Sequence, residues 1–169
     1  MAQVAPLVVL VGPPAAGKTR LGKRVSKLLG VDFVDTDAVI ASRYGPIPAL
    51  FHAEGEASFR EKERAAVIEA LTTHGVVALG GGAVINPDTR ADLRSKRVAL
   101  ISISADAVAP RLDSSKRPLL AGGLESWVSL VEARTPWYDE VASATFDTSS
   151  TPLDTVAQNI VEWITSEAA

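Results

Sequence analysis

The sequence contains no cysteine. This excludes disulfide bridges, thiolate metal sites and cysteine nucleophiles, and it allows a reducing compartment. Long hydrophobic runs are missing too, because no stretch approaches the roughly 18 apolar residues that a membrane-spanning helix needs. We therefore expect a cytoplasmic protein with no membrane partner.

An excess of positive charge is also missing. The formal net charge is −3, so no general positive field would attract the phosphates of a nucleic acid, and we expect no nucleic-acid partner. Hydrophobic residues make up 47% of the chain and charged residues 22%, as in an ordinary globular protein. A chain of 169 residues can bury one core, which indicates a single domain over residues 1–169. We take a monomer as the expected state.

Apolar runs alternate with amphipathic segments along the chain. Strands are expected at residues 7–11, 31–35, 75–79, 98–103 and 144–146. Helices are expected at residues 18–29, 37–44, 56–73, 105–112, 124–132 and 153–164, with a further helix start at Asn86 and Pro87. Strands that alternate with helices in this way indicate an α/β protein with a parallel sheet and helices on both of its faces.

The most specific motif is a glycine-rich loop between the first expected strand and the first expected helix. Small residues let backbone N–H groups wrap phosphates, while the following helix points its positive end at them. A chance glycine turn is the alternative, and the flanking strand and helix argue against it. The loop residues that match the phosphate-binding pattern are Gly12, Pro13, Pro14, Ala15, Ala16, Gly17, Lys18 and Thr19.

Within this loop, Lys18 would bridge the β- and γ-phosphates of a nucleotide, and Thr19 would hold Mg²⁺. Asp35 and Asp37 stand at the end of the second expected strand. Ligands bind at this edge of an open parallel sheet, so one carboxylate can serve the metal and the other an acceptor. The alternative is that an aspartate caps the following helix.

One helical stretch carries Glu56, Arg60 and Glu63 at spacings that let their side chains meet. From spacing alone, a solvated salt-bridge face is the better interpretation. An arginine fixed between two carboxylates can also present its guanidinium to a bound carboxylate. Spacing does not choose between the two.

Three consecutive glycines, Gly80, Gly81 and Gly82, close the third expected strand. Glycine permits a tight turn or the close approach of backbone to a ligand, and three of them favour a ligand floor. Arg117 lies in a polar, glycine-ended segment that is expected to be a mobile loop, where the alternative is a solvated basic loop. Arg134 precedes Pro136 and is either a helix-end cap or an anion clamp.

Together these motifs resemble shikimate kinase. GPPAAGKT, DTD, EGEASFREKE, GGGAV, KRPLL and RTPWYDEVA occur in the order of that family and near its spacing, over almost the whole chain. The resemblance implies a three-layer α/β/α fold of the P-loop kinase type with a central five-stranded parallel sheet. It also implies a substrate-binding segment at about residues 36–64 and a mobile lid at about residues 113–124.

The implied reaction moves the γ-phosphate of ATP, with Mg²⁺, to the 3-hydroxyl of shikimate in aromatic amino acid biosynthesis. By the same resemblance, Asp35 supports the metal through water and Asp37 holds the reacting hydroxyl. Lys18, Asp37 and Arg117 are the implied catalytic residues, and Arg111 lies near adenine. The implied shikimate contacts are Asp37, Arg60, Gly80, Gly81, Gly82 and Arg134.

Two departures from the family are visible. Thr19 replaces a more common serine, and Pro46 and Pro48 are expected to stiffen a segment that is usually more helical. Two other functions stay open at this point: a sugar-acid kinase of the gluconate type, and a nucleotide-binding switch. The two-arginine, three-glycine arrangement favours shikimate over gluconate, and the sequence shows no base-selecting motif of a switch.

Overall fold

The computed structural model describes residues 4–112 and 122–168. Five strands form one sheet in the order β2-β3-β1-β4-β5, and every neighbouring pair is parallel. The expected five-stranded parallel sheet is therefore confirmed. The strands are β1 (Val8–Val11), β2 (Asp32–Asp35), β3 (Gly75–Ala78), β4 (Val98–Ser102) and β5 (Ala144–Asp147).

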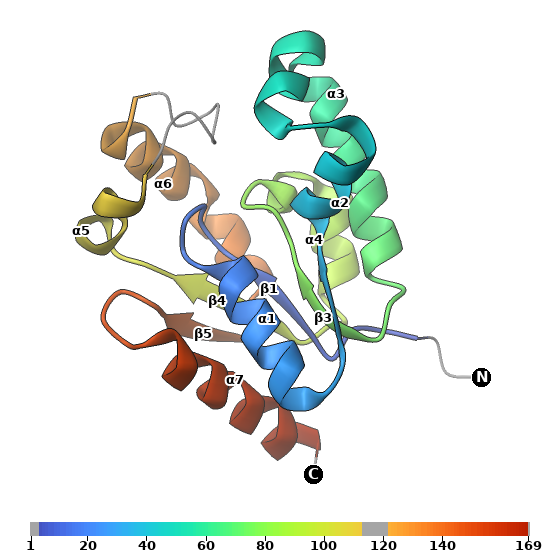
Figure 1. Cartoon of the computed structure of the whole chain (residues 1–169), viewed down its shortest axis with the longest axis vertical. Coiled ribbons are helices and arrows are strands. Elements are labelled where there is room, and N and C mark those ends of the chain that lie inside the picture. The colour runs from blue at the N-terminus through green and yellow to red at the C-terminus, as the bar shows by residue number, and fades with distance from the viewer. Residues whose placement is uncertain (1–3, 113–121, 169) are drawn as a thin grey trace.

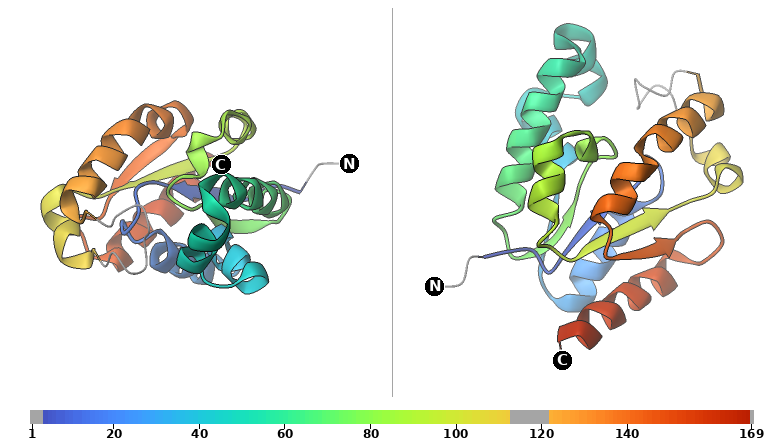
Figure 2. Two further views of the ribbon diagram at one scale, coloured as in Figure 1. Left: turned by 90° about the horizontal axis from the view of Figure 1, so that it is seen from above. Right: turned by 180° about the vertical axis from the view of Figure 1, so that it is seen from behind.

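Helices cover both faces of the sheet (Figures 1 and 2). Alternate residues of each strand point to opposite faces, so that Val8 and Leu10 join one core cluster while Val9 and Val11 join another. Helices α1 (Lys18–Leu29) and α7 (Leu153–Ala168) pack on the first cluster. The second is covered by α3 (Ile47–Ala70), α4 (Pro87–Leu93) and the end of α6 (Leu124–Val141), which completes the three-layer α/β/α arrangement.

Helix α2 (Thr36–Tyr44) and helix α3 pack on each other through a third, smaller cluster that includes Ile40 and Phe59. Helix α2 ends at Gly45, as expected, and α3 begins at Ile47. Proline fits the first turn of a helix because the first N–H groups have no intrahelical acceptor, so the two prolines start α3 and do not interrupt it. Gly55 has non-helical angles, with φ at 83° and ψ at 173°, so α3 consists of two helices joined at a kink, and the second helix begins at Glu56, as expected.

Helix α6 is also longer than the expected 124–132, because it continues through Pro136 to Val141. A proline inside a helix removes one backbone hydrogen bond. Burial of Arg134, Tyr138 and Val141 along one face of α6 offsets that loss. The interpretation of Arg134 as a helix-end cap is therefore wrong, since Arg134 lies well inside the helix.

The remaining elements are short: α5 (Ala105–Val108) and the 3₁₀ turns η1 (Ala83–Ile85) and η2 (Ala109–Arg111). The helix expected at 105–112 is thus an α-helical turn followed by a 3₁₀ turn that contains Pro110. Residues 113–121, with Arg117 and most of the expected lid, lie outside the described residues. In the two described ranges, no helix has the length and apolar character to cross a membrane.

Candidate active site

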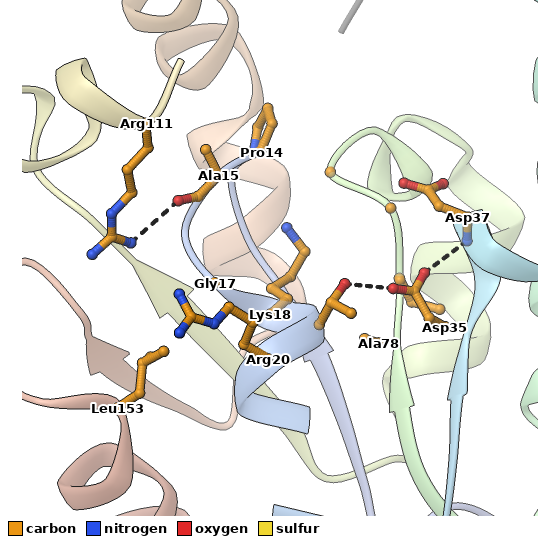
Figure 3. Close-up of a pocket in the computed structure, with 14 residues that line it drawn as sticks. Pro14, Ala15, Gly17, Lys18, Arg20, Asp35, Asp37, Ala78, Arg111 and Leu153 are labelled. Atoms are coloured by element: carbon orange, nitrogen blue, oxygen red, sulfur yellow. Dashed lines mark hydrogen bonds between the residues drawn. The ribbon is translucent and has the colours of Figure 1, made fainter. Parts of the chain in front are cut away.

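A pocket of about 490 Å³ opens at the carboxyl ends of the central strands, where the strands of an open α/β sheet present their ligands. Figure 3 shows Lys18 in its middle, the two aspartates on one side, and Arg20, Arg111 and Leu153 on the other. The volume is in the range of ordinary small-molecule sites. The pocket is lined by Pro14, Ala15, Gly17, Lys18, Thr19, Arg20, Asp35, Asp37, Ala78, Leu79, Gly80, Gly81, Arg111 and Leu153.

The phosphate-binding loop joins β1 to α1 and has the strained backbone that such a loop needs. The φ angle is 143° at Gly12 and 98° at Gly17, a region that favours glycine, and Ala15 adopts a positive φ of 65°. Lys18 Nζ donates to the main-chain oxygens of Gly12 (2.7 Å) and Pro13 (2.8 Å). No acidic residue stands in the first turn of α1, so the positive end of this helix is left for an anion.

Two side chains from distant elements hold this loop. Thr148, which follows β5 and is buried, donates its hydroxyl to the main-chain oxygen of Ala16 at 2.7 Å. Trp127 in α6 donates its indole N–H to the main-chain oxygen of Pro14 at 2.9 Å. Both contacts span more than 100 residues of sequence, and sequence reasoning missed both.

The expected metal residues meet. Thr19 Oγ1 donates to one carboxylate oxygen of Asp35 at 2.5 Å. The other oxygen of Asp35 accepts from the backbone N–H groups of Asp37 and Ala38, at 2.9 and 3.3 Å. Asp35 therefore caps α2, as the alternative interpretation predicted, and at the same time faces Thr19 (Figure 3). Capping and metal support are compatible because they use different oxygens.

Asp37 lies in the first turn of α2 beside the glycines that follow β3. A Cβ atom added to Gly80 would collide with the carboxylate of Asp37, so a larger residue at position 80 would displace that carboxylate. Thr36, which is fully buried, accepts a hydrogen bond from the backbone N–H of Gly80 at 3.2 Å. This contact joins the turn after β2 to the glycine segment and fixes where Asp37 stands.

Arg60 makes the ion pairs that its spacing predicted. Its guanidinium lies 2.9 Å from Glu63 and 3.3 Å from Glu56. The face of α3 that carries these ion pairs is not an ordinary solvated surface, because the Glu63 side chain is only 5% exposed. A Cβ at Gly82 would collide with the Arg60 guanidinium, while one at Gly81 would press against Pro14. The three glycines thus each lie against a different neighbour: the Asp37 carboxylate, Pro14 and the Arg60 guanidinium.

Arg134 joins this cluster from α6, where it is buried beside Tyr138. Burial lowers the pKa of Arg134, and it raises the pKa of Tyr138 to about 12, so both keep their protons at neutral pH. Tyr138 donates its hydroxyl to the main-chain oxygen of Gly81 at 2.6 Å. Burial also raises the pKa of Glu63 to about 7, against the opposing attraction of Arg60 and Arg134.

Arg111, the expected adenine neighbour, lies at the opposite end of the pocket from Asp37 and donates to the main-chain oxygen of Ala15 at 3.5 Å (Figure 3). Arg117 is outside the described residues. The structure therefore brings the expected residues into two groups, one around the loop and one around Glu63. Trp127 and Tyr138 stand seven residues before and four residues after Arg134, so a helix continued through Pro136 would have placed all three on one face. The contacts of Trp127 with Pro14 and of Tyr138 with Gly81 do not follow from that spacing.

A parallel α/β/α sheet with this loop at the end of β1 defines a protein of the P-loop nucleotide-binding class. The family model for shikimate kinase matches residues 14–165. The chain therefore belongs to the shikimate kinase family, as the motifs indicated.

Relatives and solved structures agree with this assignment. A shikimate kinase of Thermobifida fusca is 42% identical over 161 residues, which cover 93% of this chain and 94% of the relative. One of Saccharopolyspora erythraea is 40% identical over an alignment of 171 positions, which covers 98% of this chain and 98% of the relative. The structure of a shikimate kinase from Acinetobacter baumannii in complex with shikimate has a TM-score of 0.88 and 31% identity, with 97% of this chain and 94% of that chain covered. A gluconokinase from Sinorhizobium meliloti, at TM-score 0.65 and 16% identity over 99% and 95% of the two chains, shares the fold.

Proposed function

We propose that this chain transfers the γ-phosphoryl group of ATP to the 3-hydroxyl of shikimate, with ADP and shikimate 3-phosphate as products. One observation carries the proposal beyond family membership. The buried carboxylate of Glu63 lies 2.9 Å from the guanidinium of Arg60, and the charges of Arg134 and Asp37 are near enough to act on it. The protein thus gathers two guanidinium groups, which can bind a carboxylate of the acceptor, and the Asp37 carboxylate, which can bind a hydroxyl of the acceptor. All three groups lie beside the phosphate-binding loop.

The loop and Lys18 are the proposed site of the β- and γ-phosphates. Transfer would draw the ammonium of Lys18 from the Gly12 and Pro13 oxygens to the phosphate oxygens, where it neutralises developing charge. Arg111 is the proposed neighbour of adenine. We assign Arg117 to the phosphates from the family resemblance.

The adjacent oxygens of Thr19 and Asp35 suit Mg²⁺, a hard cation that prefers oxygen ligands and keeps several waters. Among residues 4–112 and 122–168 there is no group of three acidic or histidine side chains that could hold a metal. The proposed ion takes one hydroxyl, from Thr19, and one water-linked carboxylate, from Asp35. Bound there, Mg²⁺ would neutralise charge on the phosphates.

Asp37 is the proposed partner of the acceptor hydroxyl. Its carboxylate can orient the hydroxyl for in-line attack and accept its proton as the new P–O bond forms. Gly80, Gly81 and Gly82 form the proposed floor under the acceptor ring. Arg60 and Arg134 would bind the acceptor carboxylate through charge-assisted hydrogen bonds, which fixes the ring relative to Asp37.

A coupled assay of ADP release tests this function. We expect release to depend on shikimate, with equal concentrations of gluconate giving background rates. Gluconate is the matched control because it offers both a carboxylate and hydroxyl groups. Release with gluconate alone would assign the chain to the sugar-acid kinases, and release that ignores both acids would favour a nucleotide switch.

Four expectations about the whole molecule also remain proposals. We place the protein in the cytoplasm and take it to be a monomer, with residues 36–64 and 113–124 as its acceptor-binding and lid segments. Light scattering of the purified protein with ATP and shikimate tests the monomer, because an obligate dimer would show twice the mass of the chain.

A further inference from the structure

Arg20 is a cation of the pocket to which neither the motifs nor the family resemblance assigned a role. It stands in the first turn of α1, two residues after Lys18, and its exposed side chain lines the pocket. Figure 3 shows its guanidinium on the side of the loop that faces Leu153 and Arg111, away from Asp35 and Asp37.

A comparison with the next arginine on the same helix face shows what is unusual about Arg20. Arg24 lies one turn further along α1, and its Nε is paired with the carboxylate of Asp154 at 2.8 Å. Arg20 makes no hydrogen bond or ion pair with any residue in the described ranges. Its neighbour on α7 is the apolar Leu153, which precedes Asp154 and would contact a Cβ added to Gly17. Between α1 and α7, the Asp154 carboxylate thus pairs with Arg24 and not with Arg20, so the charge of Arg20 is available to a ligand in the pocket.

The position of Arg20 identifies the part of the nucleotide that it faces. Asp37 and the Thr19–Asp35 pair mark the end where the γ-phosphoryl group leaves, and Arg111 with Leu153 marks the opposite end. Arg20 lies between Gly17 and that opposite end. We propose that Arg20 binds the phosphate chain of the nucleotide on the α-phosphate side, and so sets the affinity for the donor. The proposal rests on the proposed function for the choice of a nucleoside triphosphate as donor and for the end of the pocket at which its γ-phosphoryl group lies.

Titration of MgADP into Arg20→Ala tests this contact without shikimate. We expect the Kd for ADP to rise about tenfold, which corresponds to about 1.4 kcal/mol for a lost charge-assisted contact in a partly solvated site. Arg20→Lys keeps the charge and should recover part of the affinity. Lys27→Ala is the matched control, because it removes one exposed cation from the same helix outside the pocket; its Kd should stay within about twofold of the wild type.

Salt dependence separates a phosphate contact from a contact with the base. A lost charge–charge contact makes log Kd depend less steeply on log salt concentration, so the slope should be flatter for Arg20→Ala than for the wild type. A raised Kd with an unchanged salt dependence would indicate that Arg20 contacts the base of the nucleotide, and it would overturn the phosphate assignment. Equal ADP affinity in Arg20→Ala and Lys27→Ala would overturn the proposal altogether.

Kinetics provides a second readout. Arg20→Ala should raise the KM for ATP while kcat at saturating ATP stays within about threefold, because the contact exists before and during transfer. Since Arg20 is exposed, the variant should fold, with a Tm within about 2 °C of the wild type. If the wild type binds ADP but does not form ADP from ATP when shikimate is added, the proposed function is wrong. The ADP titration of Arg20→Ala can still be interpreted in that case.

Discussion

The indole N–H of Trp127 lies 2.9 Å from the main-chain oxygen of Pro14, and this hydrogen bond ties α6 to the phosphate-binding loop. The indole is 3% exposed, so water cannot easily replace the donor if it is removed. The position of the loop therefore depends on a side chain that touches none of the expected ligands.

Trp127→Phe keeps an aromatic ring and removes the donor. We expect the free energy of unfolding to fall by about 1 kcal/mol and ADP affinity to weaken, with shikimate affinity unchanged. Calorimetric titration of both ligands measures this. Trp137→Phe is the control, because Trp137 stacks with Arg90 and not with the loop. Matching ADP affinities in the two variants would show that the hydrogen bond does not position the loop.

Asp37→Asn separates binding from proton chemistry. The amide keeps the shape of the side chain but cannot accept a proton, so shikimate Kd should change little while kcat falls roughly 10²- to 10⁴-fold. We expect the lower part of that range, because a loose phosphoryl-transfer transition state needs little early deprotonation. Asp32→Asn, at the exposed start of β2, is the control. An unchanged kcat would leave Asp37 with a structural role alone.

Arg60→Ala should weaken shikimate on the order of thirtyfold or more, because a carboxylate partner is lost, and should leave the Kd for ADP within about twofold of the wild type. Since Glu63 loses its ion pair as well, Arg60→Lys is the second variant: it keeps the charge and loses the planar, two-donor geometry. Arg43→Ala, which breaks an exposed pair with Glu69, is the surface control. Equal losses for shikimate and ADP would contradict a specific acceptor contact.

Glu63 makes stability depend on pH. Its pKa rises from the ordinary 4.5 to about 7 because it is buried, so between these values the folded protein binds more protons than the unfolded chain. The contribution of Glu63 to the free energy of unfolding is fully present below 4.5, the pKa of the unfolded chain, and it is lost as the pH rises through about 7, the pKa of the folded protein. The unfolding free energy of the wild type relative to Glu63→Gln should therefore fall, by on the order of 1–3 kcal/mol, between about pH 5 and about pH 8.

Urea denaturation of both proteins at the two pH values measures this difference. Arg60, Arg134 and Asp37 are the charged groups that act on Glu63, and all three remain in the variant. A difference that is constant across the range would mean that the two arginines keep Glu63 ionised throughout.

Local patterns were enough to predict much of this protein. The loop from Gly12 to Thr19, the five strands and the cap at Asp35 each depend on residues that are close in sequence. The end of α6 was misjudged because Pro136 reads as a stop, whereas its retention in the helix depends on burial against the sheet.

Contacts between distant elements were beyond prediction. The spacing of Arg60 and Glu63 indicated a pair but not that Glu63 is buried, because that burial is produced by folding. The contacts of Trp127 and Thr148 with the loop likewise join segments that no local pattern relates.

The guanidinium groups of Arg60 and Arg134 lie close enough to repel each other. Any small carboxylate that enters between them relieves this repulsion, whether or not it carries a hydroxyl in a position to react. Citrate, malonate and tartrate in purification or crystallisation solutions should therefore compete with the acceptor. A thermal-shift screen will return carboxylic acids as stabilising compounds that are never phosphorylated, so hits for this protein have to be ranked by turnover.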